Sequence, residues 1–137
     1  MDRIFQYSSN IQEIPRIRED LEFLQKEWGI SKSEIRQILV IIEEIFSNIV
    51  RYAFEDNKLH AIDIKLSLSD GQIEIEIVDD GVEFNPLNYQ LESLTDPAAS
   101  DTGGMGLTLI KAFSSRMSYE RISDKNHLCI SKSIKSK

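Results

Sequence analysis

The chain has little cysteine, little positive charge and no long apolar run. Its single cysteine, Cys129, permits neither an internal disulfide nor a cysteine-based zinc site. No apolar run approaches the roughly 20 residues that a helix needs to cross a bilayer. The N-terminal residues also lack the long apolar core and the cleavage site of a signal peptide. We therefore expect a cytoplasmic protein that does not act on a membrane.

Acidic residues outnumber basic ones. The sequence has 23 Asp and Glu against 16 Lys and Arg, a formal net charge of −7. Such a surface disfavours nucleic acid or an anionic membrane as the partner, because both require a basic footprint. The length of 137 residues, with 41% hydrophobic and 28% charged residues, predicts a single domain that spans 1–137.

The spacing of apolar residues predicts a protein that combines helices with strands. Apolar residues recur at helical spacing over 11–28 and 32–54, and Ser31 with Glu34 forms a capping-box pattern before the second run. Period-two alternation predicts two strands on either side of Asp70-Gly71, a strong hairpin signal. These two strands are expected over 62–68 and 73–77. Further strands are expected over 2–8, 117–122 and 127–133, and a third helix over 104–116.

The helix predicted over 32–54 carries an acid and an amide among apolar residues. Glu44 and Asn48 are four residues apart and therefore lie one above the other on the helix. Their carboxylate and carboxamide oxygens suit a magnesium ion carried by a nucleotide. Glu43 projects roughly 100° away from Glu44 and is expected to be a flanking acid. Taken alone, the segment is more typical of a solvated polar stripe on a half-buried helix.

Two glycine-bearing segments follow. Asp79-Asp80-Gly81 ends a predicted buried strand, where a carboxylate can accept a hydrogen bond from an exocyclic amino group; an ordinary turn has the same composition. The run over 102–107 opens a predicted helix, whose exposed N–H groups and dipole could hold phosphate. It lacks the Gly-Lys-Ser/Thr of a Walker A loop and the strand that leads into a dinucleotide fingerprint. The polar stretch between them, over 85–102, is long enough to be a functional lid.

Together these segments resemble the motifs of the GHKL ATPase superfamily. The N box would cover 43–53, the G1 box 79–86, the lid 85–102 and the G2 box 103–107. The small size and the C-terminal strands are most similar to the bacterial anti-sigma-factor serine/threonine kinases. The resemblance implies an α+β fold: a two-layer α/β sandwich, in which helices cover one face of a mixed, mostly antiparallel sheet. ATP would lie between the helices and a mobile lid.

The resemblance also implies a role for each motif residue. Glu44 would activate the attacking hydroxyl or water and, with Asn48, hold Mg²⁺ against the phosphates. Asp79 would bind the adenine amino group, and Gly81 would make room for the ring. The other nucleotide contacts would be Arg51, Tyr52, Phe84, Thr102, Gly103, Gly104, Met105, Gly106 and Leu107, of which Gly104 and Gly106 would wrap the phosphates.

The chain departs from the family pattern at several positions. Tyr52 stands where the family often has His, and Glu83 where a second glycine is frequent. The lid contains no Lys or Arg, although phosphoryl transfer relies on neutralising the charge that develops on the phosphate. Arg51 and Lys111 are the candidates for an assisting cation. ATP binding is therefore better supported than fast turnover.

The implied function is that of a magnesium-dependent serine/threonine kinase and anti-sigma factor. It would phosphorylate a small STAS-type anti-anti-sigma protein and sequester a sigma factor, and relatives often use the region 2–28 for a homodimer. One alternative is an ATP-binding module with little or no turnover. Another is the detached catalytic domain of a histidine kinase, which is disfavoured because His60 and His127, the only histidines, flank predicted strands.

Overall fold

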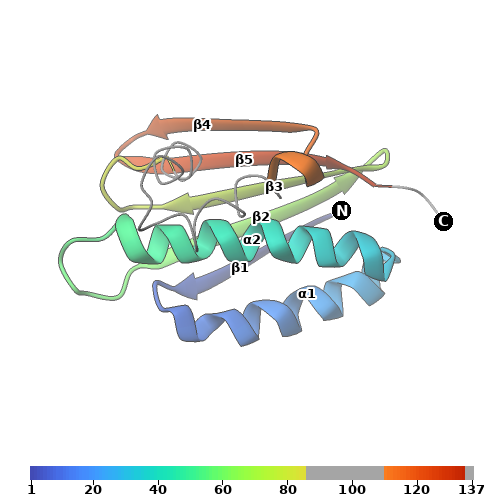
Figure 1. Ribbon diagram of the computed structural model, residues 1–137, viewed down its shortest axis with the longest axis horizontal. Helices are drawn as coiled ribbons and strands as arrows, with labels where there is room; N and C mark the ends of the chain where they lie inside the picture. The colour runs from blue at the N-terminus through green and yellow to red at the C-terminus, as the bar shows by residue number, and fades with distance from the viewer. Residues whose placement is uncertain (86–109, 135–137) are drawn as a thin grey trace, which may run out of the picture.

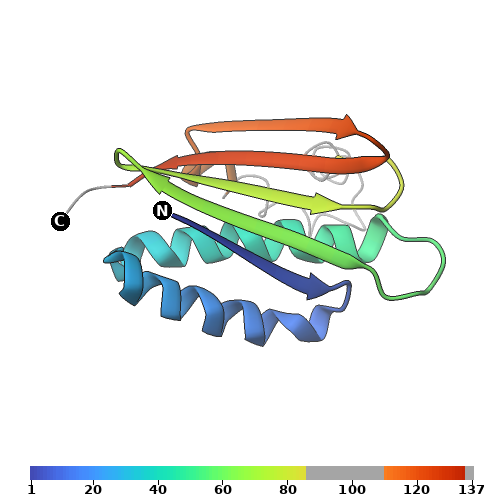
Figure 2. The same ribbon diagram turned by 180° about the vertical axis from the view of Figure 1, so that it is seen from behind.

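The computed structural model describes residues 1–85 and 110–134. It consists of one antiparallel sheet with two long helices on one of its faces (Figure 1). The strand order is β1-β2-β3-β5-β4, and every neighbouring pair is antiparallel. Both helices lie on the same side of the sheet, as the opposite view shows (Figure 2). The elements in chain order are β1 (Asp2–Ser8), the 3-10 turn η1 (Ile11–Glu13), α1 (Ile14–Trp28), α2 (Lys32–Tyr52), β2 (Ala61–Ser69), β3 (Gln72–Asp79), β4 (Arg116–Ile122) and β5 (Lys125–Ser133).

The expected two-layer α+β architecture is thus confirmed, and the sheet, expected to be mixed and mostly antiparallel, is antiparallel in every described pair. Most element boundaries agree with the sequence to within two residues, and the caps explain why. The Ser31 side chain accepts a hydrogen bond from the Glu34 backbone N–H at the start of α2. Gly29 ends α1 in the left-handed conformation with φ 69°. The first predicted helix differs at its start, because Asn10 caps a 3-10 turn before α1 begins at Ile14.

The helix predicted over 104–116 extends too far. Of that range the structure describes 110–116, and only 110–113 are helical. The Ser114 hydroxyl bonds back to the Ile110 carbonyl at 2.5 Å, and the Ser115 N–H donates to the Ser131 carbonyl at 2.8 Å. Those contacts turn the chain into the sheet, so Arg116 opens β4. Strand β5 likewise begins two residues earlier than predicted, at Lys125.

Two tight turns fix the sheet register. Asp70 and Gly71 both have positive φ, 52° and 74°, as the hairpin signal predicted. Ser123 and Asp124 adopt the same left-handed conformation, with φ 51° and 63°, without a glycine. The second turn joins β4 to β5 and sets Arg121 opposite Asn126, while in the separate β3–β5 pair Asn126 lies directly opposite Asp79.

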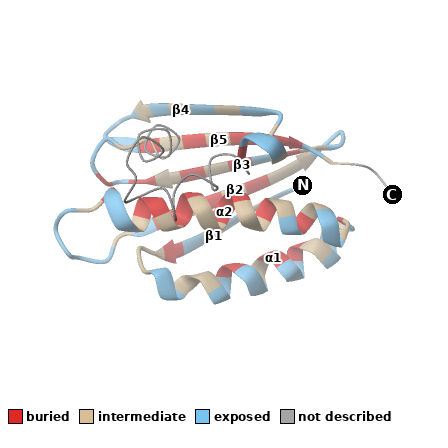
Figure 3. Cartoon of the chain, in the orientation of Figure 1, coloured by how far each residue is buried: buried red, intermediate tan, exposed pale blue. Residues whose placement is uncertain are grey.

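The core lies between the sheet and the helices (Figure 3). Alternate residues of β2 and β3 point into it, and the broad apolar stripe of α2 covers them. Its largest fully buried side chains include Phe46, Ile38, Ile42, Ile45, Ile62, Ile64 and Leu66. Asp79 continues the inward alternation of β3, so its side chain is buried beside the helix layer. Within 1–85 and 110–134, no helix is both long and apolar enough to cross a membrane.

Candidate functional site

The C-terminal half of α2 carries the predicted acid and amide. Asn48 is only 3% exposed, and its Nδ2 has no hydrogen-bond partner in the described part of the chain. An unpaired buried donor costs about 1–3 kcal/mol, so the amide calls for a partner outside the described residues, either a ligand or another part of the chain. Glu44 lies one turn earlier and is half-buried. Burial raises the pKa of Glu44, Arg51 partly opposes that shift, and Glu43 adds to it.

Glu43 faces away from this pair. Its two carboxylate oxygens accept hydrogen bonds from Arg18 of α1 at 2.9 and 2.8 Å. The ion pair links the two helices at their exposed side. Glu43 therefore serves the packing of α1 on α2, and Glu44 is the acid of the pair that the site can use.

Asp79 ends β3 as a buried carboxylate. It is 2% exposed, and its Oδ1 accepts hydrogen bonds from the Gly81 N–H at 2.8 Å and from Asn126 Nδ2 at 2.9 Å. Burial raises the pKa of Asp79, and these two hydrogen bonds with the charge of Arg121 oppose the rise. Both bonds end on Oδ1, so these two donors leave Oδ2 uncommitted.

Gly81 makes the closest approach of the site. A Cβ at this position would lie 2.4 Å from the Ala53 carbonyl oxygen and 2.8 Å from the Ala53 Cβ. The next N–H, that of Val82, donates to the same carbonyl at 2.8 Å. The space that glycine leaves is therefore filled by the end of α2. This contact brings the N-box helix and the G1 segment together, while the predicted role of Gly81 toward an adenine ring remains a prediction.

The helix geometry gives the scale of the site. Asn48 lies five residues before Ala53, or about 7.5 Å along the axis at 1.5 Å per residue. The segment that follows Asp79 is thus docked roughly one and a half turns from the orphaned amide. Two of the three predicted motifs converge on one end of α2.

Arg51 and Tyr52 occupy the last turn of α2. Arg51 is exposed and acts on Glu44 through its charge. The Tyr52 ring lies 5.9 Å from the Phe84 ring at a 42° tilt. Tyrosine at this position therefore closes the G1 segment onto the helix, whereas histidine, which the family often has, would present a smaller ring.

Asn126, Tyr119 and Arg121 complete the site, and sequence analysis missed all three. Asn126 is buried opposite Asp79, and it also receives hydrogen bonds from Tyr119 and Arg121 of β4. Arg121 donates a second bond to the Gly81 carbonyl at 2.7 Å. A buried polar residue just after a tight turn was the available signal, but its partner could be known only from the strand register.

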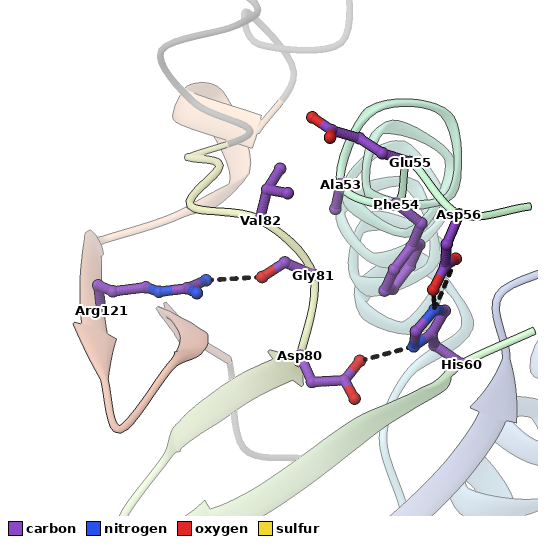
Figure 4. Close-up of a pocket in the computed structure, with 9 residues that line it drawn as sticks. All are labelled: Ala53, Phe54, Glu55, Asp56, His60, Asp80, Gly81, Val82 and Arg121. Atoms are coloured by element: carbon purple, nitrogen blue, oxygen red, sulfur yellow. Dashed lines mark hydrogen bonds and ion pairs between the residues drawn. The ribbon is translucent and has the colours of Figure 1, made fainter. Parts of the chain in front are cut away.

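A cavity of about 320 Å³ opens beside the G1 segment, between the end of α2 and β4 (Figure 4). His60 stands in its wall, stacked on Phe54 at 4.5 Å between ring centroids. Its ring nitrogens pair with Asp56 at 2.9 Å and with Asp80 at 3.1 Å. The Asp56 hydrogen bond, assisted by the charges of both carboxylates, raises the pKa of His60. The residues lining this cavity are Ala53, Phe54, Glu55, Asp56, His60, Asp80, Gly81, Val82 and Arg121.

The residues present fit a magnesium nucleotide at the α2 side of the site. Asn48 and Glu44 offer hard oxygens one turn apart, which is the ligand type that Mg²⁺ prefers, and the orphaned Nδ2 can donate to a phosphate oxygen. The predicted phosphate loop, Thr102, Gly103, Gly104, Met105, Gly106 and Leu107, lies outside the described residues, as does the lid from residue 86 onward.

The chain is similar in sequence to known proteins. Residues 7–132 match the family model of the histidine kinase-like ATPase domain. The serine/threonine-protein kinase BtrW of Bordetella bronchiseptica is 30% identical over 93 residues, which cover 64% of this chain and 63% of that protein. An anti-sigma F factor of Oceanobacillus iheyensis is 30% identical over 81 residues, covering 58% and 56%. The chain thus spans less than two thirds of the length of these relatives.

A solved structure shares the fold. The crystal structure of the RsbU and RsbW domains of Rv1364c from Mycobacterium tuberculosis matches with a TM-score of 0.70 at 16% identity. The match covers 100% of this chain and 33% of that one. At this identity the likeness extends to the arrangement of helices and strands alone.

Proposed function

The chain belongs to the histidine kinase-like ATPase domain family, and from that premise we propose that it is a Mg-ATP-dependent serine/threonine kinase and anti-sigma factor. It transfers the γ-phosphate to a serine or threonine of a small STAS-type anti-anti-sigma protein. It also binds a sigma factor, and the phosphorylation state of the antagonist decides which partner is bound. The similarity to proteins named serine/threonine-protein kinase and anti-sigma F factor supports this choice within the family.

One observation carries the proposal: Asn48 is buried with an unpaired amide, one turn from a half-buried acid, on the helix to which the Asp79 segment docks. In this proposal Asn48 and Glu44 hold the ion, which neutralises phosphate charge when bound. Asp79 accepts from the adenine amino group through Oδ2. Arg51, exposed beside Glu44, provides a cation at the phosphate end.

Glu44 is the group that accepts the proton of the attacking hydroxyl. A general base works best with a pKa near the operating pH, and burial shifts Glu44 in that direction. Its carboxylate form is also required, so phosphoryl transfer should increase as the pH rises through the folded pKa of Glu44.

The test incubates the protein with γ-labelled ATP and candidate STAS-type acceptors. Glu44→Ala should abolish label transfer at saturating nucleotide, while ATP is still bound, more weakly in its magnesium form. Glu43→Ala is the matched control, because the neighbouring acid is occupied by Arg18; it should transfer label at nearly the wild-type rate. Equal transfer by the Glu44 variant and the wild type would refute the assignment of the base.

A second candidate function is an ATP-binding module whose partner affinity responds to nucleotide without phosphoryl transfer. Tyr52 packs on Phe84 at the position where the family often has histidine, and Glu83 adds negative charge beside them. ATP would then change partner affinity through its differential binding to two states. Partner capture that depends on ATP, with no label transferred to any acceptor, would select this function over the kinase.

The detached catalytic domain of a histidine kinase has less support. His60 is held between Asp56 and Asp80 just before β2, and His127 lies on β5. Neither is on a helix that could present it as a phosphoacceptor to a second subunit. Acid-labile label transferred from ATP to a histidine on a separate dimerising helical hairpin would favour this alternative.

A further inference from the structure

Asn126 is a buried carboxamide that none of the predicted motifs contains. It is 2% exposed and faces Asp79 across the β3–β5 pair. The Ser123-Asp124 turn before it has two non-glycine residues at positive φ, a conformation that costs roughly 1–2 kcal/mol per residue, and it pairs Asn126 with Arg121 of β4. Asn126 therefore lies between Asp79 of β3 on one side and Arg121 of β4 on the other.

The amide of Asn126 uses its full hydrogen-bonding capacity. Nδ2 donates to Asp79 Oδ1 at 2.9 Å and to the Val82 carbonyl at 2.8 Å. Oδ1 accepts from the Phe84 N–H at 3.2 Å, from Arg121 at 3.1 Å and from the Tyr119 hydroxyl. Reversing the amide would place its two N–H groups against three donors, so the surroundings permit one orientation.

This arrangement has a specific effect on Asp79. With the Gly81 N–H, Asn126 occupies Oδ1, so neither of these donors engages Oδ2. The bonds to the Val82 carbonyl and the Phe84 N–H tie the segment after Asp79 to the same amide. A change at Asn126 would therefore alter both the direction of the carboxylate and the position of the segment beside it.

We propose that Asn126 is a positioning residue for nucleobase recognition, which selects a base bearing an exocyclic amino group by directing Asp79 Oδ2 toward it. The inference rests on the proposed binding of adenine nucleotides. The inference names Asn126 as the residue that sets the specificity for the base. Asn126 acts through Asp79 and is not assigned any contact with the nucleotide.

The test compares two nucleotides that differ in the amino group alone. Calorimetry in the presence of magnesium measures the affinity for ATP and for purine riboside triphosphate, which lacks the 6-amino group. A hydrogen bond to a charged acceptor corresponds to about 10- to 100-fold in affinity, so the wild-type protein should prefer ATP by that factor. Asn126→Ala should reduce the preference to within about threefold, whereas a merely structural loss would weaken both nucleotides equally and overturn the proposal.

Tyr119→Phe is the matched control. It removes one of the three donors to Asn126 Oδ1 and leaves the Asn126–Asp79 bond in place. The Phe84 N–H and Arg121 still hold the amide, so the nucleotide preference should match that of the wild type while the melting temperature falls. A loss of preference equal to that of Asn126→Ala would show that the network as a whole, and not the bond to Asp79, sets the specificity.

If the alanine variant fails to fold, Asn126→Asp replaces it in the test, because aspartate has nearly the same side-chain shape as asparagine. It places a carboxylate against Asp79 beside Arg121, and two carboxylates in contact bind a shared proton. Protonated, the new side chain can again donate to Asp79 Oδ1. The deficit in ATP affinity relative to wild type should therefore shrink as the pH falls from 8 to 5.5, and a deficit that is independent of pH would overturn the proposal.

The outcomes separate this inference from the function on which it rests. Wild-type protein without measurable affinity for ATP would remove both. Wild-type protein that prefers ATP, with variants that keep the preference, would remove the role of Asn126 and leave ATP binding intact.

Discussion

Replacing Gly81 by alanine tests how the G1 segment is held. The added Cβ would lie 2.4 Å from the Ala53 carbonyl oxygen, 2.8 Å from the Ala53 Cβ and 2.9 Å from its carbonyl carbon. Two of these three atoms belong to the backbone at the end of α2, so no flexible side chain can move aside. The segment after Asp79 must withdraw from the helix.

The magnitude follows from two losses. Overpacking a tight contact costs about 1–3 kcal/mol, and loss of the 2.8 Å hydrogen bond from the Val82 N–H to the Ala53 carbonyl costs about 0.5–1.5 kcal/mol. We expect a destabilisation of about 2–4 kcal/mol. At an unfolding entropy of about 2.1 cal/mol/K per residue, each kcal/mol lowers the Tm of a 137-residue domain by roughly 3.5 °C, so the melting temperature should fall by about 7–14 °C.

The assay is thermal unfolding followed by circular dichroism, in protein free of nucleotide. Gly29→Asn is the control, because Gly29 has positive φ and nothing within 4 Å of a Cβ, and asparagine tolerates that conformation at a cost of about 1 kcal/mol or less. A Gly81 variant that melts like the wild type but loses ATP affinity would refute the docking role. The glycine would then serve the nucleotide ring alone.

Three further changes test the site. Asn48→Ala should weaken Mg-ATP binding about 10-fold or more and nucleoside binding little, since the lost groups are assigned to the ion and phosphates; equal losses in calorimetry would contradict that assignment. Asp79→Asn should reduce the preference for ATP over GTP at least several-fold, because a carboxamide must also present a donor; an unchanged ratio in competition binding would contradict the role of Asp79. His60→Gln should be most destabilising below about pH 6.5, the ordinary pKa of histidine. The destabilisation should disappear as the pH rises through the folded pKa of His60, which the bond to Asp56 raises. Unfolding in urea at several pH values measures the difference in stability, and a difference that does not depend on pH would show that the charge of His60 contributes nothing.

The elements that carry local signals were predictable from the sequence. The residues that form the apolar stripe of α2 and its Ser31–Glu34 cap all lie within or next to one helix, and the Asp70-Gly71 turn lies within one hairpin. Period-two alternation likewise placed β2 and β3 to within a residue or two. In each case the residues that determine the structure lie within a few positions of one another, so periodicity and capping suffice.

The contacts that build the site depend on strand register and could not be predicted. Asn126 and Asp79 are 47 residues apart and meet because β3 pairs with β5 in the register that sets them opposite each other. The 81–84 segment also depends on a distant contact, because Ala53, the last residue of the predicted N box, leaves room only for glycine at position 81. His60 carried no sequence signal either, since both of its carboxylate partners come from loops.

The two ends of the proposed site are prepared in different ways. At the base end, Asp79 is already held by Asn126 and by the Gly81 N–H, so recognition there needs little reorganisation. At the phosphate end, Asn48 keeps a donor with no partner among the described residues, which a phosphate oxygen can satisfy. The described residues give Asn48 and Asp79 no common hydrogen-bond partner, and sites without shared partners are additive within about 0.3–0.5 kcal/mol. The free-energy losses in Mg-ATP binding of Asn48→Ala and Asp79→Asn should therefore sum in the double variant, and a coupling above about 1 kcal/mol would mean that base and phosphate are bound as one cooperative unit.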